Sequence, residues 1–198
     1  MNIKGELQLN ICIVNDNFDI GGVQRVAIEL ANTLEERGNQ ITLIDFSGKN
    51  NFYYKVNENI NIPNAIQPRN LKRKIVGKIL WTYSSISKKQ IEVLKLYKEQ
   101  IGDLLEYLKN NRHEILILCQ GMLTALIPLV KEKISNIKVI AWQHNEYEIY
   151  VNQYYKRYIK NYLNGIKYAD LVVSLTEDDQ KRFGNINKNS TYIYNPLT

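Results

Sequence analysis

Residues 9–45, LNICIVNDNFDIGGVQRVAIELANTLEERGNQITLID, contain the pattern that decides the fold. A mostly apolar run at residues 9–14 predicts a strand that is buried on both faces, and a turn rich in Asn, Asp and Gly follows it. Apolar residues then recur with helical spacing over residues 23–34, and Gly38 is placed to end that helix. Residues 41–44 supply a second apolar strand, so the stretch is the opening βαβ unit of a parallel sheet.

The rest of the chain continues this alternation of strands and helices. Apolar runs predict further strands at residues 114–119, 137–142, 170–175 and 190–194, with a short one at residues 60–62. Helical spacing predicts helices at residues 91–109, 123–133, 147–167 and 176–183. The sequence therefore predicts an α/β fold, Rossmann-like and doubly wound, with a mainly parallel sheet.

A stripe of tyrosines runs along the predicted helix at residues 147–167. Large amphipathic rings at helical spacing are typical of a buried face and its rim. A platform for binding carbohydrate is the alternative interpretation of the same stripe.

Composition limits the class of protein. The chain has 198 residues, 44% hydrophobic and 23% charged, as expected of a globular domain with a real core. Its two cysteines lie in apolar runs, which predicts buried reduced thiols. Two histidines without paired cysteines make a metal site unexpected. The amino terminus lacks the apolar core of a signal peptide and no run of about 18 apolar residues occurs, so we expect a cytoplasmic protein that does not span a membrane.

Positive charge is concentrated in residues 69–98, which carry nine Lys or Arg residues and one acid. The rest of the chain carries 17 basic and 19 acidic side chains, so all of the net charge of +6 comes from this segment. It predicts a basic amphipathic helix that ends near residues 82–87. An anionic membrane surface is the expected partner of its leading cations, Arg69, Lys72, Arg73, Lys74 and Lys78. The alternative is a surface helix whose apolar side packs on the domain, and no motif supports nucleic-acid binding.

Eight residues of the opening unit carry a resemblance to a known family. Their order and spacing resemble the amino-terminal domain of family-4 retaining glycosyltransferases, which have two Rossmann-like domains in the GT-B fold; the residues are Gly21, Gly22, Arg25, Leu30, Ala31, Leu34, Arg37 and Gly38. Two later strings, ADLVVSLTEDDQKRF at residues 169–183 and YIYNPLT at residues 192–198, resemble the family's next strand and helix and its hinge. The resemblance spans roughly the whole chain and is weakest over residues 46–113.

This resemblance implies a division of the enzyme into two parts. Residues 1–194 would be the Rossmann-like, acceptor-side domain, and residues 195–198 would begin the hinge to a donor-binding domain outside this chain. The reaction implied is the retaining transfer of a sugar from a nucleotide-diphosphate sugar to an acceptor hydroxyl, without a metal or other cofactor. The acceptor would be a lipid-linked or cell-surface glycan in polysaccharide biosynthesis, reached from the inner face of the membrane. The chain alone is expected to be inactive.

The resemblance also implies roles for individual residues. The catalytic candidate is His144, which would hydrogen-bond the donor sugar. The substrate-binding candidates are Gly21, Gly22, Arg25, Asn145, Glu146, Thr176 and Glu177. Three of these assignments have local alternatives: Arg25 can pair with Glu29 one turn on, Thr176 is a good helix cap, and a backbone carbonyl can satisfy His144.

A different class of function remains open at this point. The chain could be a non-catalytic Rossmann-like binding module that docks on an anionic surface through residues 69–98. A second α/β domain following residue 198 would decide for the enzyme.

Overall fold

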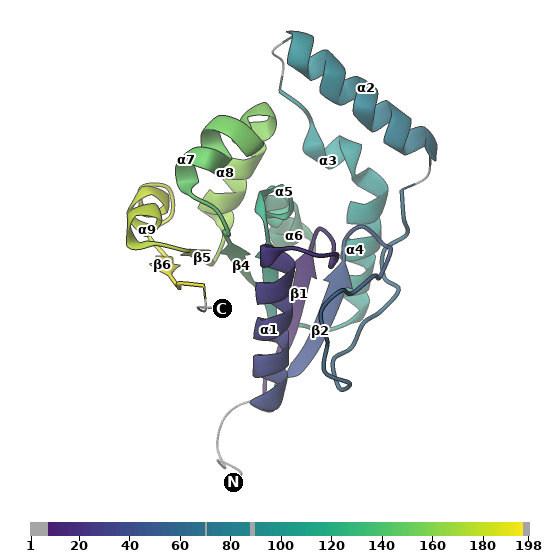
Figure 1. The fold of residues 1–198 in the computed structure, drawn as a ribbon, viewed down its shortest axis with the longest axis vertical. Helices are drawn as coiled ribbons and strands as arrows, with labels where there is room; N and C mark the ends of the chain where they lie inside the picture. The colour runs from purple at the N-terminus through teal and green to yellow at the C-terminus, as the bar shows by residue number, and fades with distance from the viewer. Residues whose placement is uncertain (1–7, 70, 88–89, 196–198) are drawn as a thin grey trace.

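The computed structural model describes residues 8–69, 71–87 and 90–195, and it confirms the predicted α/β class (Figure 1). Its strands are β1 (Asn10–Asn15), β2 (Gln40–Asp45), β3 (Ile115–Cys119), β4 (Lys138–Trp142), β5 (Leu171–Ser174) and β6 (Ser190–Tyr192). The strand predicted at residues 60–62 is wrong, because Asn61 makes only an isolated bridge to Thr42. The predicted start of a hinge at residues 195–198 lies, apart from Asn195, outside the described residues.

The six strands form one sheet in the order β2-β1-β3-β4-β5-β6, and every neighbouring pair is parallel. The chain leaves β1 for one edge of the sheet and returns to the other side of β1, so a topological switch point lies between β1 and β3. In open parallel sheets ligands bind outside the carboxyl ends of the strands at such a point. Asn15 is paired with Asp45 and with Cys119, which brings the carboxyl ends of the first three strands level.

Helices cover both faces of the sheet, unequally. The described helices are α1 (Gly22–Glu36), α2 (Leu71–Ser87), α3 (Val93–Leu96), α4 (Lys98–Asn110), α5 (Gly121–Thr124), α6 (Ile127–Lys133), α7 (Tyr147–Ile149), α8 (Ile159–Tyr168) and α9 (Glu177–Gly184), and not all of them pack on the sheet. On one face α1 packs Ala27, Ile28 and Ala31 against β1 and its neighbours. Helices α4, α6 and α8 cover the opposite face, around the larger part of the core. Both cysteines are buried and free, as predicted.

The α1 face of the sheet is only partly covered. Beside α1, a hollow of about 700 Å³ lies over the apolar side chains of β4 and β5, among them Ile140, Trp142, Leu171 and Val173. Strands of parallel sheets are ordinarily covered on both faces. In the described part of the chain, α1 is the helix on this face and it does not reach across the hollow (Figure 1).

Three helices predicted as continuous are broken. The helix predicted at residues 91–109 divides at Tyr97 into α3 and α4, and that at residues 123–133 divides into α5 and α6. Pro128 explains the second break, because it has no N–H to donate to the carbonyl four residues earlier. The predicted helix at residues 147–167 is replaced by α7, a π turn (Tyr150–Tyr154), a 3₁₀ turn (Lys156–Tyr158) and α8.

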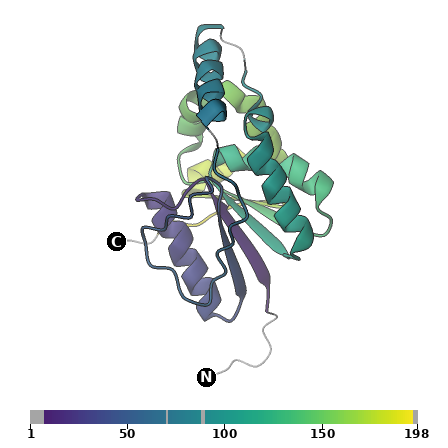
Figure 2. The ribbon, with the colours of Figure 1, turned by 90° about the vertical axis from the view of Figure 1, so that its right-hand side faces the viewer.

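The basic helix α2 is longer than predicted and projects from the body of the domain (Figures 1 and 2). Residues 82–87 were expected to end it, yet they continue the helix to Ser87. Thr82 donates a hydrogen bond from Oγ1 to the Lys78 carbonyl at 2.9 Å, so its hydroxyl is satisfied within the helix rather than against it. No helix within the described ranges is long and apolar enough to cross a bilayer.

The close contact between α5 and α8 gives a test of the packing. A Cβ on Gly165 would lie 2.0 Å from the carbonyl oxygen of Thr124, which is backbone and cannot move aside alone. We therefore expect Gly165→Ala to lower the free energy of unfolding by about 2–3 kcal/mol. The exposed Gly102 of α4 has nothing within 4 Å of its Cβ position, so Gly102→Ala should raise it by about 0.5–1 kcal/mol. Urea denaturation measures both; equal stability of the two variants would contradict the packing described.

Candidate functional site

The candidate site lies at the carboxyl edge of the sheet, where the turns after β1, β3 and β4 meet. These turns are residues 16–21, residues 120–121 and residues 143–146. They flank the switch point between β1 and β3 or lie one strand away from it. The sheet order therefore brings together segments that are more than a hundred residues apart in sequence.

The turn after β1 leaves the start of α1 open. Gly21 caps the helix in an extended conformation without a side-chain hydrogen bond, and no acidic residue occupies the first turn. A Cβ on the exposed Gly22 would meet nothing within 4 Å, and one on Gly21 would meet the end of the Gln24 side chain at 2.3 Å. The backbone conformation does not demand these glycines. What they provide is space above the first amides of a helix, where an anionic group is favoured.

This turn is held by its own side chains. Phe18 is fully buried and stacks on Phe52 with ring centroids 4.7 Å apart. The side-chain oxygen of Asn17 accepts hydrogen bonds from the backbone of Asp19 at 3.1 Å and from Gln24 at 3.2 Å. The open helix start is thus presented by an ordered turn.

Asp16, directly after β1, was not identified from the sequence. Burial raises the pKa of its carboxyl group above the ordinary range. Burial raises the pKa values of the Tyr155 and Tyr158 hydroxyls, and the nearby negative charge of Asp16 raises them further, to a smaller extent. Its place at the carboxyl end of a buried strand was the signal available in the sequence.

The predicted substrate-binding residue Arg25 is engaged within its own helix. Its Nε lies 2.7 Å from Glu29 Oε1, and both side chains are 42% exposed. An exposed pair of this spacing stabilises a helix by a few tenths of a kcal/mol. The local alternative seen in the sequence is therefore the contact that the structure contains.

The turn after β3 is strained and tightly packed. Gln120 has a φ of 92°, a region that favours glycine. Gly121 follows it, and a Cβ there would lie 1.8 Å from the Tyr155 ring. The Gly121 N–H donates to the Tyr155 hydroxyl at 2.9 Å. Strain of this kind clusters at functional sites.

His144 lies just beyond β4, and its side chain is buried. Neither ring nitrogen has a hydrogen-bond partner among the described residues, so the backbone carbonyl considered from the sequence is not found. The ring packs on Trp142 with centroids 4.5 Å apart, and the indole Nε1 is buried and unpartnered as well. Buried polar atoms nearly always have a hydrogen-bond partner. The two imidazole nitrogens and the indole nitrogen are therefore expected to bind a polar ligand or water.

The protonation state of His144 follows from its burial. Burial lowers the pKa of the imidazole to about 4. At neutral pH the ring is therefore uncharged, with one nitrogen able to donate a hydrogen bond and the other able to accept one. It can bind a hydroxyl or a phosphate oxygen, but it does not bring a positive charge to the site.

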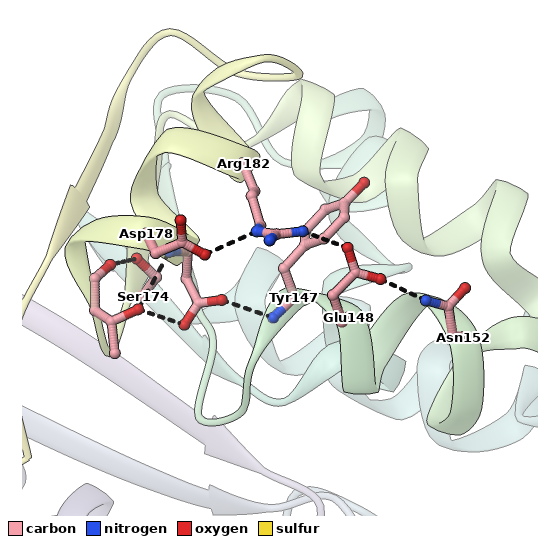
Figure 3. A network of polar contacts seen from close by, with 8 residues as sticks. Tyr147, Glu148, Asn152, Ser174, Asp178 and Arg182 are labelled. Atoms are coloured by element: carbon pink, nitrogen blue, oxygen red, sulfur yellow. Dashed lines mark hydrogen bonds and ion pairs between the residues drawn. The ribbon is translucent and has the colours of Figure 1, made fainter.

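Beyond His144, the chain is tied to the start of α9, as Figure 3 shows. The Tyr147 N–H donates to Asp179 Oδ1 at 2.8 Å, and the Thr176 hydroxyl donates to Asp179 Oδ2 at 2.7 Å. Arg182 adds a second link, bonded to Asp178 at 2.8 Å and to Glu148. These contacts hold α7 against α9.

The remaining candidates near this link differ in exposure. Thr176 Oγ1 accepts the Asp179 N–H at 3.1 Å, so Thr176 caps α9, as its local alternative predicted. Glu177 is exposed and pairs with Lys181 at 2.8 Å. Glu146 is exposed at the start of α7, and Asn145 is half-buried beside His144.

Four tyrosines of the predicted stripe form the support beneath the site. Tyr150, Tyr155, Tyr158 and Tyr162 are all less than 9% exposed, which confirms the structural interpretation for these four. Tyr162 donates to the side chain of the fully buried Gln143 at 2.9 Å. The Gln143 amide in turn donates to Thr124 at 3.0 Å. Sequence reasoning missed Gln143.

The structure thus brings together some of the predicted site residues and separates others. Gly21, Gly22, His144 and Asn145 lie at the carboxyl edge, whereas Arg25, Thr176 and Glu177 make local contacts. The predicted membrane residues Lys74 and Lys78 are exposed on α2, and Arg69 packs over the Tyr97 ring at 4.7 Å. The side chains of Lys72 and Arg73 lie outside the described residues. Where residues are described, no three His, Cys, Asp or Glu side chains form a group that could hold a metal ion.

A family model and a curated relative both indicate a glycosyltransferase. The model of glycosyltransferase family 4 matches residues 20–197. An uncharacterized glycosyltransferase of Haemophilus influenzae is 32% identical over 186 residues, which are 90% of this chain and 44% of that protein. The chain therefore spans less than half the length of this relative.

Solved structures share the fold at low identity. A lipopolysaccharide outer core galactosyltransferase, WaaB, in its apo form matches 95% of this chain and 46% of its own, with a TM-score of 0.65 and 13% identity. A sucrose-phosphate synthase from Thermosynechococcus elongatus matches 94% of this chain and 48% of its own, with a TM-score of 0.61 and 10% identity. An alpha-glucosyltransferase in complex with UDP-glucose and DNA matches 97% and 44%, with a TM-score of 0.56 and 15% identity.

The burial of His144 predicts a pH dependence of stability. Its pKa is about 4 in the folded chain, below the ordinary value of about 6.5 that applies when unfolded. The unfolded chain therefore binds the proton more readily, and stability falls as the pH is lowered from 7 towards 4. The expected loss from this group between pH 7 and pH 5 is about 2 kcal/mol.

Urea denaturation at the two pH values, on the natural chain and on His144→Gln, measures this contribution. His113 is also buried with a lowered pKa, so His113→Gln serves as the comparison and should remove a separate part of the slope. A His144→Gln chain whose stability falls as steeply as that of the natural chain would show that the imidazole is not held neutral.

Proposed function

The chain belongs to glycosyltransferase family 4, and from that premise we propose that it is the acceptor-side half of an enzyme that transfers a sugar from a nucleotide-diphosphate sugar to an acceptor hydroxyl. The transfer retains the configuration of the sugar. The other half, which would follow this domain, supplies most contacts to the nucleotide. This division is supported by the relative and the structural neighbours, of which the chain covers less than half.

One observation carries the proposal: an unpartnered buried imidazole lies at the same sheet edge as an uncapped helix start. His144 follows β4 and Gly22 begins α1 after β1, with β3 between the two strands. Neighbouring strands lie about 4.8 Å apart, so the two turns are about 10 Å apart. A sugar with its attached phosphate can bridge that span, its hydroxyls at His144 and its phosphate at the helix start.

The chemistry suits these groups. As the bond to the leaving diphosphate breaks, negative charge grows on the phosphate oxygens and positive charge on the sugar ring. The first amides of α1 point at the place where the negative charge develops, and such preorganised donors stabilise it. The neutral His144 holds the sugar by a hydrogen bond without adding a positive charge beside the ring. One structural neighbour was solved with UDP-glucose, which supports a donor of this class.

We further propose that α2 holds the enzyme at an anionic membrane, where a lipid-linked acceptor would lie. Six large apolar side chains on α2 are 42–78% exposed: Ile75, Val76, Ile79, Leu80, Tyr83 and Ile86. Most of its apolar surface therefore does not pack on the domain. The Trp81 ring is an exception, since it meets the Tyr158 ring edge-on with centroids 6.4 Å apart. Lys74 and Lys78 are exposed on the same helix. Cations beside an exposed apolar face are typical of helices that lie on membranes.

The catalytic part of the proposal is tested with the full-length enzyme. We expect His144→Ala to lower kcat by on the order of 10²–10³ while leaving the acceptor KM within a few fold, because one preorganised hydrogen bond that holds the reacting sugar in the transition state is lost. His113→Gln is the control, since His113 lies at the other end of β3, hydrogen-bonded to Asn10 at 2.9 Å. Unchanged turnover of the His144 variant, with an unchanged melting temperature, would rule out a catalytic role.

The membrane part is tested by co-sedimentation with vesicles. Each Lys or Arg near an anionic bilayer contributes about 1 kcal/mol, and salt screens it. We expect the domain to pellet with anionic but not neutral vesicles at low salt. Changing Lys72, Arg73, Lys74 and Lys78 to Glu should abolish this. The charge-matched control changes four exposed lysines elsewhere to Glu, namely Lys109, Lys160, Lys167 and Lys188. Equal effects of the two quadruple variants would contradict a role for α2.

A further inference from the structure

Two backbone N–H groups of the candidate site donate hydrogen bonds to tyrosine hydroxyls of a single segment, residues 150–155. The His144 N–H donates to the Tyr150 hydroxyl at 3.0 Å, and the Gly121 N–H donates to the Tyr155 hydroxyl at 2.9 Å. Both contacts are buried. The first amide belongs to the turn after β4 and the second to the turn after β3, so one segment holds both turns.

A π turn makes this double contact possible. The Tyr155 N–H bonds to the carbonyl of Tyr150 at 2.8 Å, five residues back, where an α-helix would bond four back. In a regular α-helix, residues five apart point in directions well over a right angle apart. Here the two rings instead stack, with centroids 4.6 Å apart and planes 22° apart. Single π turns inside helices are frequent at functional sites.

The receiving turn is shaped for this ring. The Tyr155 ring occupies the space of a side chain on Gly121, where a Cβ would lie 1.8 Å from Cε2. Gln120, next to it, is in the strained left-handed region at φ 92°. A strained backbone conformation persists only where neighbouring contacts hold it. The hydrogen bond from the Gly121 N–H to the Tyr155 hydroxyl is one of those contacts.

We propose that Tyr150 and Tyr155 are positioning residues of the transfer site, which through their hydroxyls hold the backbones of His144 and Gly121 and so place the imidazole at the carboxyl edge of the sheet. Their aromatic rings fill the core, and a phenylalanine would do this equally well. The hydroxyls are what the two turns require, since without them two buried N–H groups lose their acceptors. We call the two hydrogen bonds, from His144 N–H to Tyr150 and from Gly121 N–H to Tyr155, the tyrosine tie. The importance of this tie for catalysis rests on the proposed function, whereas the tie itself does not.

The tie is tested by NMR on the chain described here, without an activity assay. The chain contains two histidines, so each imidazole can be followed through a pH titration, with His113 as an internal reference. In Tyr150→Phe we expect the His144 ring to become hydrated and its pKa to rise by about one unit or more from its value of about 4. The His144 amide should also exchange its hydrogen on the order of tenfold faster than in the natural chain.

The second hydroxyl gives a paired expectation at a different amide. In Tyr155→Phe the Gly121 amide should lose protection from exchange, while the pKa of His144 moves less than in Tyr150→Phe. Tyr154→Phe is the matched control, since Tyr154 lies in the same π turn and is 55% exposed. It should leave the exchange of both amides and the pKa of His144 unchanged.

The outcomes separate the tie from simple packing. A folded Tyr150→Phe chain with the His144 pKa and amide exchange of the natural chain would overturn the proposal. If Tyr150→Phe does not fold, Tyr155→Phe decides, and unaltered protection of Gly121 there would overturn it. In the full-length enzyme we expect Tyr150→Phe to lower kcat more than it raises the donor KM. If His144→Ala leaves turnover intact, the catalytic proposal fails while the NMR result still stands.

Discussion

The parallel pairing of β1 with β3 is the contact on which the rest of this structure depends. It joins residues about a hundred positions apart, with Asn15 level with Cys119, and it creates the switch point at the carboxyl edge. The turn that presents the start of α1 and the turn that carries Gly121 become neighbours only through this pairing. His144 joins them because β4 pairs with β3 in turn, with Trp142 level with Cys119. The candidate site is therefore a property of the sheet order.

Much of the fold could be predicted because strands and helices have different periods. The apolar runs at residues 9–14 and 114–119 are short and continuous, as strands covered on both faces require, and both are strands. The errors arose where one residue or a distant contact overrides a helical pattern. Pro128 divides a predicted helix through its missing N–H. The π turn at Tyr150 follows no sequence period, because the contacts of Tyr155 with Gly121 stabilise it from outside the segment.

The candidate site was predictable in position but not in chemistry. The glycines before α1 and the histidine after β4 could be placed at one sheet edge, since parallel strands end together. Arg25 with Glu29, and Thr176 with its own helix, follow from spacings of three or four residues that a sequence displays. The burial of His144, its unpartnered ring and the space that Gly121 leaves for Tyr155 depend on residues that no local pattern relates. Those features follow only from the three-dimensional arrangement of the chain.

The strand order also determines when each strand can pair during synthesis of the chain. β1 and β2 are complete once Asp45 has left the ribosome, but β1 gains its second neighbour only after the chain has been made through Cys119. In that interval the edge of β1 that will pair with β3 is open, the condition in which partly folded chains associate. From β4 onward each new strand pairs with the one made just before it. Assembly therefore waits on one long-range closure and then proceeds in the order of synthesis.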